Sequence, residues 1–421
     1  WNLGFSYNRL KNFNRSYKMS NNGQDYSMAD YVAWRASNAF GYGNGITEEE
    51  LTYVKGSYDP YYNSDLAGQW LPILGYETEF FGHYAGGKNE YQSSFGRYKD
   101  DQWVIDSPYK NSLVVNERGH MDEYNIGFGM NVSNFLFFGA SVSVTDIDYR
   151  YSSSYEDFFA YDDKKDDHLY LENSLNTEGT AVSVNVGAIV NLQMLRLGVA
   201  YNSPRWYDMT DYFFAQAGTY INGYDNPSVV NQTPDDAYSE YKFRTPGKWI
   251  FSGAVIFGQS ALISADYEIM DYRKMTFSDK DGNDDFYTND YIDDDYTWAH
   301  TLKLGTEIKV TPQFAVRAGY MMQTSPMRKA LANNDVEVLP AGTVPHFTVT
   351  SKPTNYYTVG LGYRFTPNFY MDLACIYRYN SSHAYAFSNT YTPKEEIDVY
   401  SEPGSLKTKT TRLALTLGYK F

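Results

Sequence analysis

The closing segment of the chain alternates regularly between apolar and polar side chains. One face takes the odd positions, including Leu413, Leu415, Leu417 and Tyr419, and the other takes the even positions, including Arg412. Alternation with a period of two over this length predicts a β-strand with one apolar and one polar face. Such a strand suits either the edge of a soluble β-sandwich or the wall of a membrane β-barrel.

The same alternation recurs in pairs of segments that are joined by short turns. The turns contain Pro, Asn, Gly or Ser, which are residues that tight turns favour. The pairs are 123–132 with 135–149, 180–191 with 195–202, 248–257 with 261–275, 298–310 with 314–323, and 356–365 with 369–379. Together with an opening segment at 1–10 and the closing segment, these five pairs predict twelve strands.

Long connections alternate with the short turns. They span 11–117, 150–179, 203–243, 276–297, 324–355 and 380–407. One rim of the predicted structure therefore carries turns and the other carries long loops, as in outer-membrane barrels. We expect residues 1–421 to form a single all-β transmembrane antiparallel barrel, with residues 11–117 as a long extracellular loop insertion. A short helix is expected near 28–40, where apolar residues share one helical face.

Charged residues recur on the polar faces of the predicted strands. They include Arg317, Arg364, Arg378, Arg412, Glu307 and Asp372, together with Asp266, Glu268, Lys303 and Lys309. A soluble sandwich would bury these charges in its core, where ions are rare, whereas a membrane barrel places them in its lumen. We expect opposite charges on neighbouring strands to pair and to stiffen a narrow lumen.

The composition of the chain argues against nucleic acid as a partner, against membrane-spanning helices and against disulfide bonds. The net charge of −16 argues against nucleic acid as a partner, because phosphate backbones need a basic surface. No segment approaches the roughly 20 apolar residues of a membrane helix, and the acidic residues of the loops account for a mean hydropathy of −0.53. The single cysteine, Cys375, excludes a disulfide framework. The 43 tyrosines suit interfacial aromatic girdles.

Several short stretches, in their order and spacing, resemble a known family. They are 195–204, which ends in Ser-Pro, then 243–246, 251–255, 263–267, 304–307, 316–320, 325–326, 360–363 and 371–374. Over about residues 120–421 they resemble the FadL-type outer-membrane transport proteins, in a Bacteroides-like style. The aromatic C-terminal residue also resembles the assembly signal of such barrels. The resemblance implies about fourteen strands and an N-terminal hatch; the sequence predicts twelve strands and shows no hatch motif.

The resemblance implies a function in the bacterial outer membrane. FadL-type channels passively admit hydrophobic small molecules such as long-chain fatty acids, which apolar outer-loop residues capture and the barrel or its wall releases. The expected partners are outer-membrane lipids and the hydrophobic ligand; no cofactor and no enzymatic activity are expected. The candidate capture residues are Trp206, Met209, Tyr212, Phe213 and Phe214, with Phe158 and Phe159 in the preceding loop. Loop packing or an interfacial aromatic belt would explain them equally well, and a lumen arginine could hold a fatty acid carboxylate.

Other functions remain open at this point. Some FadL-like barrels hold partner or cargo proteins, so a PorV-like scaffold or shuttle of type IX secretion is the alternative, and a general porin is a third. Asp279, Asp281 and Asp285 form a weak calcium candidate, because the glycine and the final glutamate of a calcium loop are misplaced. The six histidines are scattered without paired-ligand spacing, so neither a metal site nor a catalytic site is indicated.

Overall fold

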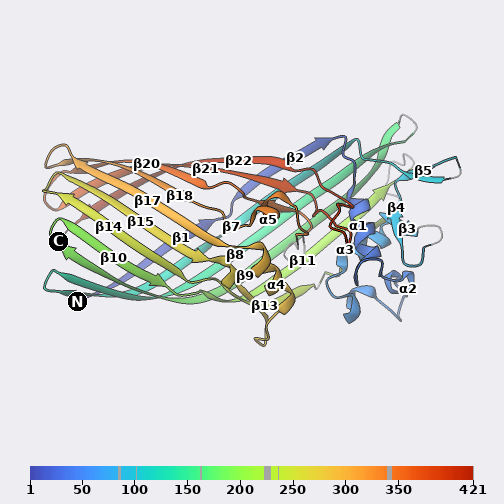
Figure 1. Ribbon diagram of the computed structural model, residues 1–421, viewed down its shortest axis with the longest axis horizontal. Coiled ribbons are helices and arrows are strands. Elements are labelled where there is room, and N and C mark those ends of the chain that lie inside the picture. The colour runs from blue at the N-terminus through green and yellow to red at the C-terminus, as the bar shows by residue number, and fades with distance from the viewer. Residues whose placement is uncertain are drawn as a thin grey trace.

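One curled antiparallel sheet of eighteen strands forms the body of the computed structural model, which describes residues 1–83, 87–100, 102–161, 164–221, 229–235, 237–338 and 344–420 (Figure 1). Twelve of these strands follow one another around the sheet. In spatial order they are β1 (Asn2–Asn12), β7 (Lys110–Val132), β8 (Leu136–Tyr161), β9 (Lys164–Leu192), β10 (Leu195–Asn202), β14 (Lys248–Phe257), β15 (Ala261–Asp271), β17 (Trp298–Lys309), β18 (Phe314–Gln323), β20 (Thr354–Arg364), β21 (Phe369–Tyr385) and β22 (Gly404–Tyr419).

The twelve predicted strands, the five tight-turn pairs and the antiparallel order are confirmed, but the sheet also contains six strands that the sequence did not predict. β1 pairs with β7 and β22 pairs with β21, so these two strands are the edges of the sheet in the described part of the chain. Both termini lie at the end of the barrel that carries the short turns (Figure 1). No described helix is long and apolar enough to span a membrane.

A band of exposed apolar side chains surrounds the outer face of the sheet. Ile126, Val142, Leu361 and Leu415 are 47–61% exposed although they lie on four different strands. Such exposure suits lipid rather than water, and it alternates along each strand with the polar face that lines the lumen. We call the lipid-side surface the outer face and the opposite surface the inner face.

Aromatic rings from neighbouring strands meet at one boundary of this band. Their centroids lie 5.4 Å apart between Tyr7 and Tyr124, 4.8 Å between Tyr201 and Trp249, and 5.4 Å between Tyr320 and Tyr357. Aromatic side chains with a polar tip favour the membrane–water interface, so these pairs form an aromatic girdle. The abundance of tyrosine therefore has a structural role in the barrel.

The prediction of a loop at 150–179 was wrong. β8 and β9 continue through this segment as one long hairpin and pair from Leu136 to Phe159. Apolar inner-face residues such as Tyr155 and Leu171 are fully buried, while charged residues alternate with them on the outer face. The charges resembled a loop composition, but the alternation is that of a strand. The acidic residues Asp162 and Asp163 lie outside the described residues.

The other predicted loops also contain regular structure. Residues 203–243 hold β11 (Trp206–Tyr220), β12 (Val229–Gln232) and β13 (Tyr238–Arg244). Residues 276–297 hold β16 (Thr276–Asp279) and α4 (Phe286–Asp295), which follow the short helix η3 (Tyr272–Lys274). Residues 324–355 hold α5 (Lys329–Asn333) and β19 (Phe347–Val349). β11 pairs with β9 and β13 pairs with β11, so the wall of the barrel extends outward beyond the membrane band.

The long insertion folds into a compact layer that we call the cap, the described residues within 23–109. It begins where β2 (Arg15–Asn22) leaves β7 and ends at Lys110, so it is shorter than the predicted 11–117. It contains α1 (Met28–Ser37), α2 (Glu48–Leu51), η1 (Pro60–Tyr62), η2 (Ser64–Leu66), α3 (Trp70–Glu77), β3 (Phe81–His83), β4 (Tyr91–Ser93), β5 (Gly96–Lys99) and β6 (Gln102–Ile105). The predicted helix near 28–40 is confirmed as α1.

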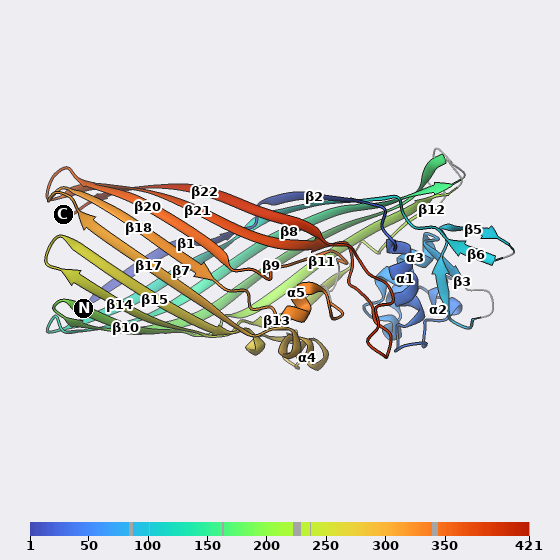
Figure 2. The same cartoon turned by 45° about the horizontal axis from the view of Figure 1, so that its top comes forward.

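The cap packs against the inner face of the extended wall. It lies at the end of the barrel opposite the termini (Figure 2). Fully buried residues of the cap, such as Met28 and Leu74, join one apolar core with Tyr155 and Leu171 of the wall and Phe387 of the segment after β21. Because a single core spans the cap and the wall, the cap is a folded layer rather than a set of loose loops.

The lipid-facing assignment of β22 gives a direct prediction. Leu415→Arg should destabilise the barrel by about 2–4 kcal/mol, because a cation on the outer face must then lie in hydrocarbon. Thr416→Arg is the matched control, since Thr416 lies opposite Asp372 on the inner face. Urea unfolding in lipid vesicles, followed by the heat-modifiable gel mobility of folded barrels, measures both variants. Equal destabilisation by the two substitutions would contradict the assignment.

Candidate functional site

An apolar group of side chains lies on the inner face of the wall, at the cap end of the membrane band. We call it the inner cluster: Met121, Ile147, Ala181, Tyr207, Met209, Tyr241, Phe243 and Phe277. It assembles because alternate positions of adjacent strands share one face: Tyr207 lies opposite both Ala181 and Phe243, and Met209 lies opposite Tyr241. Gly179 supplies the space for Met209, whose Sδ occupies the position where a Cβ of residue 179 would lie.

The inner cluster borders a polar zone on its membrane side. Arg205 precedes Tyr207 by two residues on the same face, and its guanidinium donates to Glu123 at 2.7 Å. The Nε atom of Arg205 is buried and has no hydrogen-bond partner among the described residues. Beyond it, Asn125 and Asn185 both donate to the hydroxyl of Ser143, at 2.7 and 3.1 Å. The inner surface is therefore polar on the membrane side of Arg205, and on its cap side the inner cluster is apolar up to Asp211, which accepts from Thr177 and Tyr241.

Two prolines separate the extended wall from the membrane part of the sheet. Pro204 lies between β10 and β11, and Pro246 lies between β13 and β14. Proline has no backbone N–H to donate, so it interrupts a ladder of strand hydrogen bonds. One backbone hydrogen bond still joins the two chain segments between these prolines and the extended wall: the Thr245 N–H donates to the Arg205 carbonyl at 3.0 Å. The break in the ladder adjoins the inner cluster.

The lumen holds two groups of paired charges. Arg317 donates to Glu307 at 2.6 Å and also to Asp372. Glu268 accepts from Lys248 at 3.2 Å and also from Lys303. Each group draws its members from more than one hairpin, so it ties neighbouring strands together. A cavity of about 500 Å³ adjoins both groups.

The remaining predicted lumen arginines lie apart from these groups. Arg378 stands over the ring of Tyr356, with 5.8 Å between its guanidinium carbon and the ring centroid, and its Nε atom is buried without a hydrogen-bond partner among the described residues. Arg364 is exposed near the end of β20, and Arg412 is exposed on the edge strand β22. The structure thus brings together Arg317, Glu307 and Asp372 but not the whole predicted polar set.

The predicted capture residues divide between the two faces of β11 and β8. On β11, Met209 and Phe213 are on the inner face, whereas Trp206, Tyr212 and Phe214 are on the outer face. Phe213 is buried and meets the ring of Trp70 in the cap edge-on, with the centroids 4.8 Å apart. These residues therefore do not form one surface, because the segment is a strand and not a loop.

The two phenylalanines of β8 also point in opposite directions. Phe159 is buried on the inner face and stacks on Phe95 of the cap, with the centroids 4.2 Å apart. Phe158 is on the other face, beneath the amine of Lys110. The sequence also offered Tyr207 as a capture residue but missed Phe243, which a strand assignment with alternating faces would have found.

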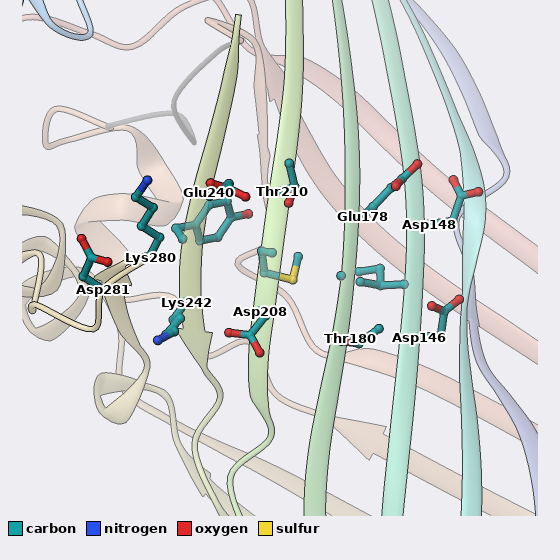
Figure 3. A pocket seen from close by; sticks show the side chains of 14 residues that line it. Asp146, Asp148, Glu178, Thr180, Asp208, Thr210, Glu240, Lys242, Lys280 and Asp281 are labelled. Atoms are coloured by element: carbon teal, nitrogen blue, oxygen red, sulfur yellow. The ribbon is translucent and has the colours of Figure 1, made fainter.

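The outer face carries an acidic hollow of about 740 Å³ on the same strands (Figure 3). Its carboxylates are Asp146, Asp148, Glu178, Asp208, Glu240 and Asp281, with Lys242 and Lys280 beside them. These side chains lie on the outer face of the extended wall, beyond the apolar band. The hollow is therefore a water-exposed feature on the other side of the wall from the inner cluster.

The predicted calcium loop uses its oxygen atoms internally. Asp279 accepts from the backbone N–H groups of Asp281 and Asn283 at 2.9 and 2.8 Å. Asp285 caps α4 by accepting from the backbone N–H of Thr288 at 3.1 Å. Among the described residues, no group of three Asp, Glu, His or Cys side chains could hold a metal ion.

Helix α1 sits on a buried carboxylate of the wall. Asp157 on β8 accepts from the backbone N–H of Met28 and from the hydroxyl of Tyr155, both at 2.7 Å. Burial raises the pKa of Asp157 to about 7, despite both hydrogen bonds. His346, whose Nδ1 lies 2.6 Å from the carbonyl of Ala386, is also buried in this contact, and burial lowers its pKa to about 4.

The raised pKa of Asp157 predicts how cap stability depends on pH. Between about pH 4 and 7 the Asp157 carboxyl is protonated when the cap is docked and ionised when the cap is undocked. Protonation therefore stabilises the docked cap more at pH 5 than at pH 8. The lowered pKa of His346 makes docking of the cap less favourable below about pH 6.5, and this effect is the same in the wild type and in both variants. Asp157→Asn should therefore reduce the gain in cap melting temperature between pH 8 and pH 5, whereas Asp208→Asn on the outer face should not. Parallel pH profiles of wild type and Asp157→Asn would contradict the prediction.

One family of outer-membrane proteins matches most of this chain. A family model described as outer membrane protein transport protein (OMPP1/FadL/TodX) matches residues 123–421. A Pseudomonas aeruginosa FadL homologue is 14% identical over 75% of this chain and 77% of its own, with a TM-score of 0.43. The Pseudomonas putida toluene transporter TodX is 14% identical over 78% and 74%, with a TM-score of 0.38. The Ralstonia pickettii toluene transporter TbuX is 11% identical over 78% and 84%, with a TM-score of 0.38. No curated protein matches the chain.

Proposed function

Because this chain belongs to the outer membrane protein transport family of OMPP1, FadL and TodX, we propose that it is a passive channel for hydrophobic small molecules such as long-chain fatty acids. The inner cluster is the observation that carries this proposal for the chain itself. It presents apolar side chains to the interior of a barrel whose lumen is otherwise polar. Burial of apolar ligand surface there supplies affinity at about 25 cal/mol per Å².

The polar neighbour of the cluster favours a ligand with an anionic end. Arg205 lies two residues from Tyr207 on the same face, and its Nε atom lacks a hydrogen-bond partner among the described residues. A carboxylate is a strong acceptor for a guanidinium. A fatty acid can therefore lay its chain on the inner cluster while its carboxylate approaches Arg205, in competition with Glu123. An aromatic hydrocarbon would use the cluster alone.

The interrupted ladder offers a route of release. Pro204 and Pro246 weaken the strand pairing beside the inner cluster, where an ordinary pair of strands would be continuous. A ligand on the cluster could leave through this part of the wall into the bilayer, while the paired charges of the lumen obstruct a direct apolar path. Diffusion down a concentration gradient then needs no energy source.

Uptake by whole cells tests this function. Cells that lack their own fatty acid channel should take up labelled oleate at least about tenfold faster when they express the full chain. Butyrate, which crosses membranes unaided, is the control and should enter at an unchanged rate. Equal oleate uptake with and without the protein would refute the channel, and a surface partner protein that co-purifies with the chain would then favour the scaffold function.

A further inference from the structure

A second hollow, of about 470 Å³, lies in the cap on the side away from the wall contacts. It is bounded by α1, by β4 and by the segment 398–399 that returns from the end of the barrel. Four aromatic residues line it, Tyr26, Trp34, Tyr42 and Tyr91, and three acidic residues, Asp30, Glu90 and Asp398. None of its lining residues is a lysine or an arginine. We call it the cap hollow.

The aromatic wall of the cap hollow is held in place. The indole Nε1 of Trp34 donates to Oδ2 of Asp398 at 2.8 Å, which fixes the ring and sets a carboxylate at its edge. Asp30 precedes Trp34 by one helical turn, so the two side chains share a face of α1. Tyr26 packs edge-on against Tyr400, with the centroids 5.1 Å apart. Tyr42 and Glu90 are exposed, so the hollow is open to the outside.

The electric potential in the cap hollow is negative. Burial raises the pKa of Tyr26, and the nearby carboxylates of Asp398, Asp30 and Asp25 raise it further. The pKa of a tyrosine rises where negative charges surround it, because its deprotonated form is also negative. The negative faces of the aromatic rings act in the same direction as the carboxylates.

We propose that the cap hollow binds a small organic cation, with a primary amine or quaternary ammonium head. Both kinds of cation are attracted to aromatic faces and to carboxylates. A primary ammonium is strongly hydrated, whereas a quaternary ammonium is weakly hydrated and leaves water at lower cost, so the quaternary head is the better fit. A neutral sugar could also stack on Trp34 and Tyr42 and donate its hydroxyls to the carboxylates. A cation has in addition the attraction of its charge to the carboxylates and to the ring faces, with no basic residue in the lining to oppose it. The site is separate from the inner cluster and does not depend on the uptake function.

Binding of choline to the purified full-length chain tests the proposal. A non-ionic detergent is required, because a detergent with an ammonium head would compete for the site. Isothermal titration should show choline binding at millimolar concentration, and 3,3-dimethyl-1-butanol, which has the same shape without the charge, should bind at least about tenfold more weakly. Equal binding of the two compounds, a neutral disaccharide binding in place of choline, or no choline binding at all would overturn the proposal.

Charge-neutralising variants locate the site. The pair Asp398→Asn and Glu90→Gln should weaken choline binding at least about fivefold, because both charges are lost while the amide oxygen that replaces the carboxylate can still accept from the indole of Trp34. Glu49→Gln neutralises an exposed carboxylate of the cap outside the hollow and is the matched control. Unchanged far-ultraviolet circular dichroism establishes that each variant is folded. Equal choline affinity in the control and in the paired variant would place the cation elsewhere and refute the assignment.

Discussion

Replacing Phe213 with alanine should release the cap from the barrel wall while the barrel itself stays folded. The side chain is only 8% exposed and joins the core that the cap shares with the wall. Its ring meets Trp70 of α3, so truncation removes an aromatic contact and leaves a cavity. Truncation of a buried phenylalanine costs about 3–5 kcal/mol, which is a large part of the roughly 5–15 kcal/mol that keeps a typical domain folded. Limited proteolysis should then cleave the cap, residues 23–109, much faster than in the wild type.

Phe214 provides a matched control for this experiment. It is the next residue along β11 and has the same size, but it lies on the opposite face of the strand. Phe214→Ala should leave the protease resistance of the cap unchanged, and the barrel of both variants should keep its heat-modifiable mobility. A cap that stays resistant in Phe213→Ala, or that becomes equally sensitive in both variants, would show that Phe213 does not hold it.

The pair of substitutions Met209→Ser and Phe243→Ser should weaken fatty acid binding about 70-fold. Both side chains belong to the inner cluster, and losing about 100 Å² of apolar contact costs about 2.5 kcal/mol. Displacement of a fluorescent fatty acid by oleate, measured on purified protein, gives the affinity. Oleate uptake by cells should fall in parallel if the cluster lies on the transport route.

The outer face of β11 supplies the control for the inner cluster. Tyr212→Ser with Phe214→Ser removes two aromatic rings from the same strand, and the sequence makes both of them candidate capture residues. Their position on the outer face predicts unchanged affinity and unchanged uptake. A greater loss in this pair than in the inner pair would reject the inner cluster as the binding surface and restore the outer aromatic residues as candidates.

The strands could be predicted from the sequence because their signal is local. Alternation within one strand and turn residues between two strands lie within a few positions of each other, so the five hairpins needed no knowledge of distant contacts. The register of Glu307 opposite Arg317 follows from the turn between β17 and β18 in the same way. The third member, Asp372, comes from β21, and Arg317 reaches it across β20, where Gly362 has no side chain to stand between them.

The capture surface could not be predicted because a loop was expected at residues 203–243, whereas the capture residues of this segment lie on strand β11. In a loop at residues 206–214, neighbouring aromatic residues could gather freely, whereas a strand sends Phe213 and Phe214 in opposite directions. The contact of Phe213 with Trp70 joins positions far apart in the sequence and has no local signature. The charged residues of 150–179 suggested a loop, so the extension of β8 and β9 was not predicted. The alternation of those charged residues with apolar ones in the sequence nevertheless indicates a strand.

The length of β9 has a consequence for where a solute first meets the protein. The strand has 29 residues, so it runs for about 95 Å at roughly 3.3 Å per residue. Crossing the hydrocarbon takes only about 9–11 of those residues. The rest carries the mouth of the barrel and its cap away from the lipid, into the layer of surface sugars that normally excludes greasy compounds. A solute therefore encounters a protein surface before it would have to traverse that layer.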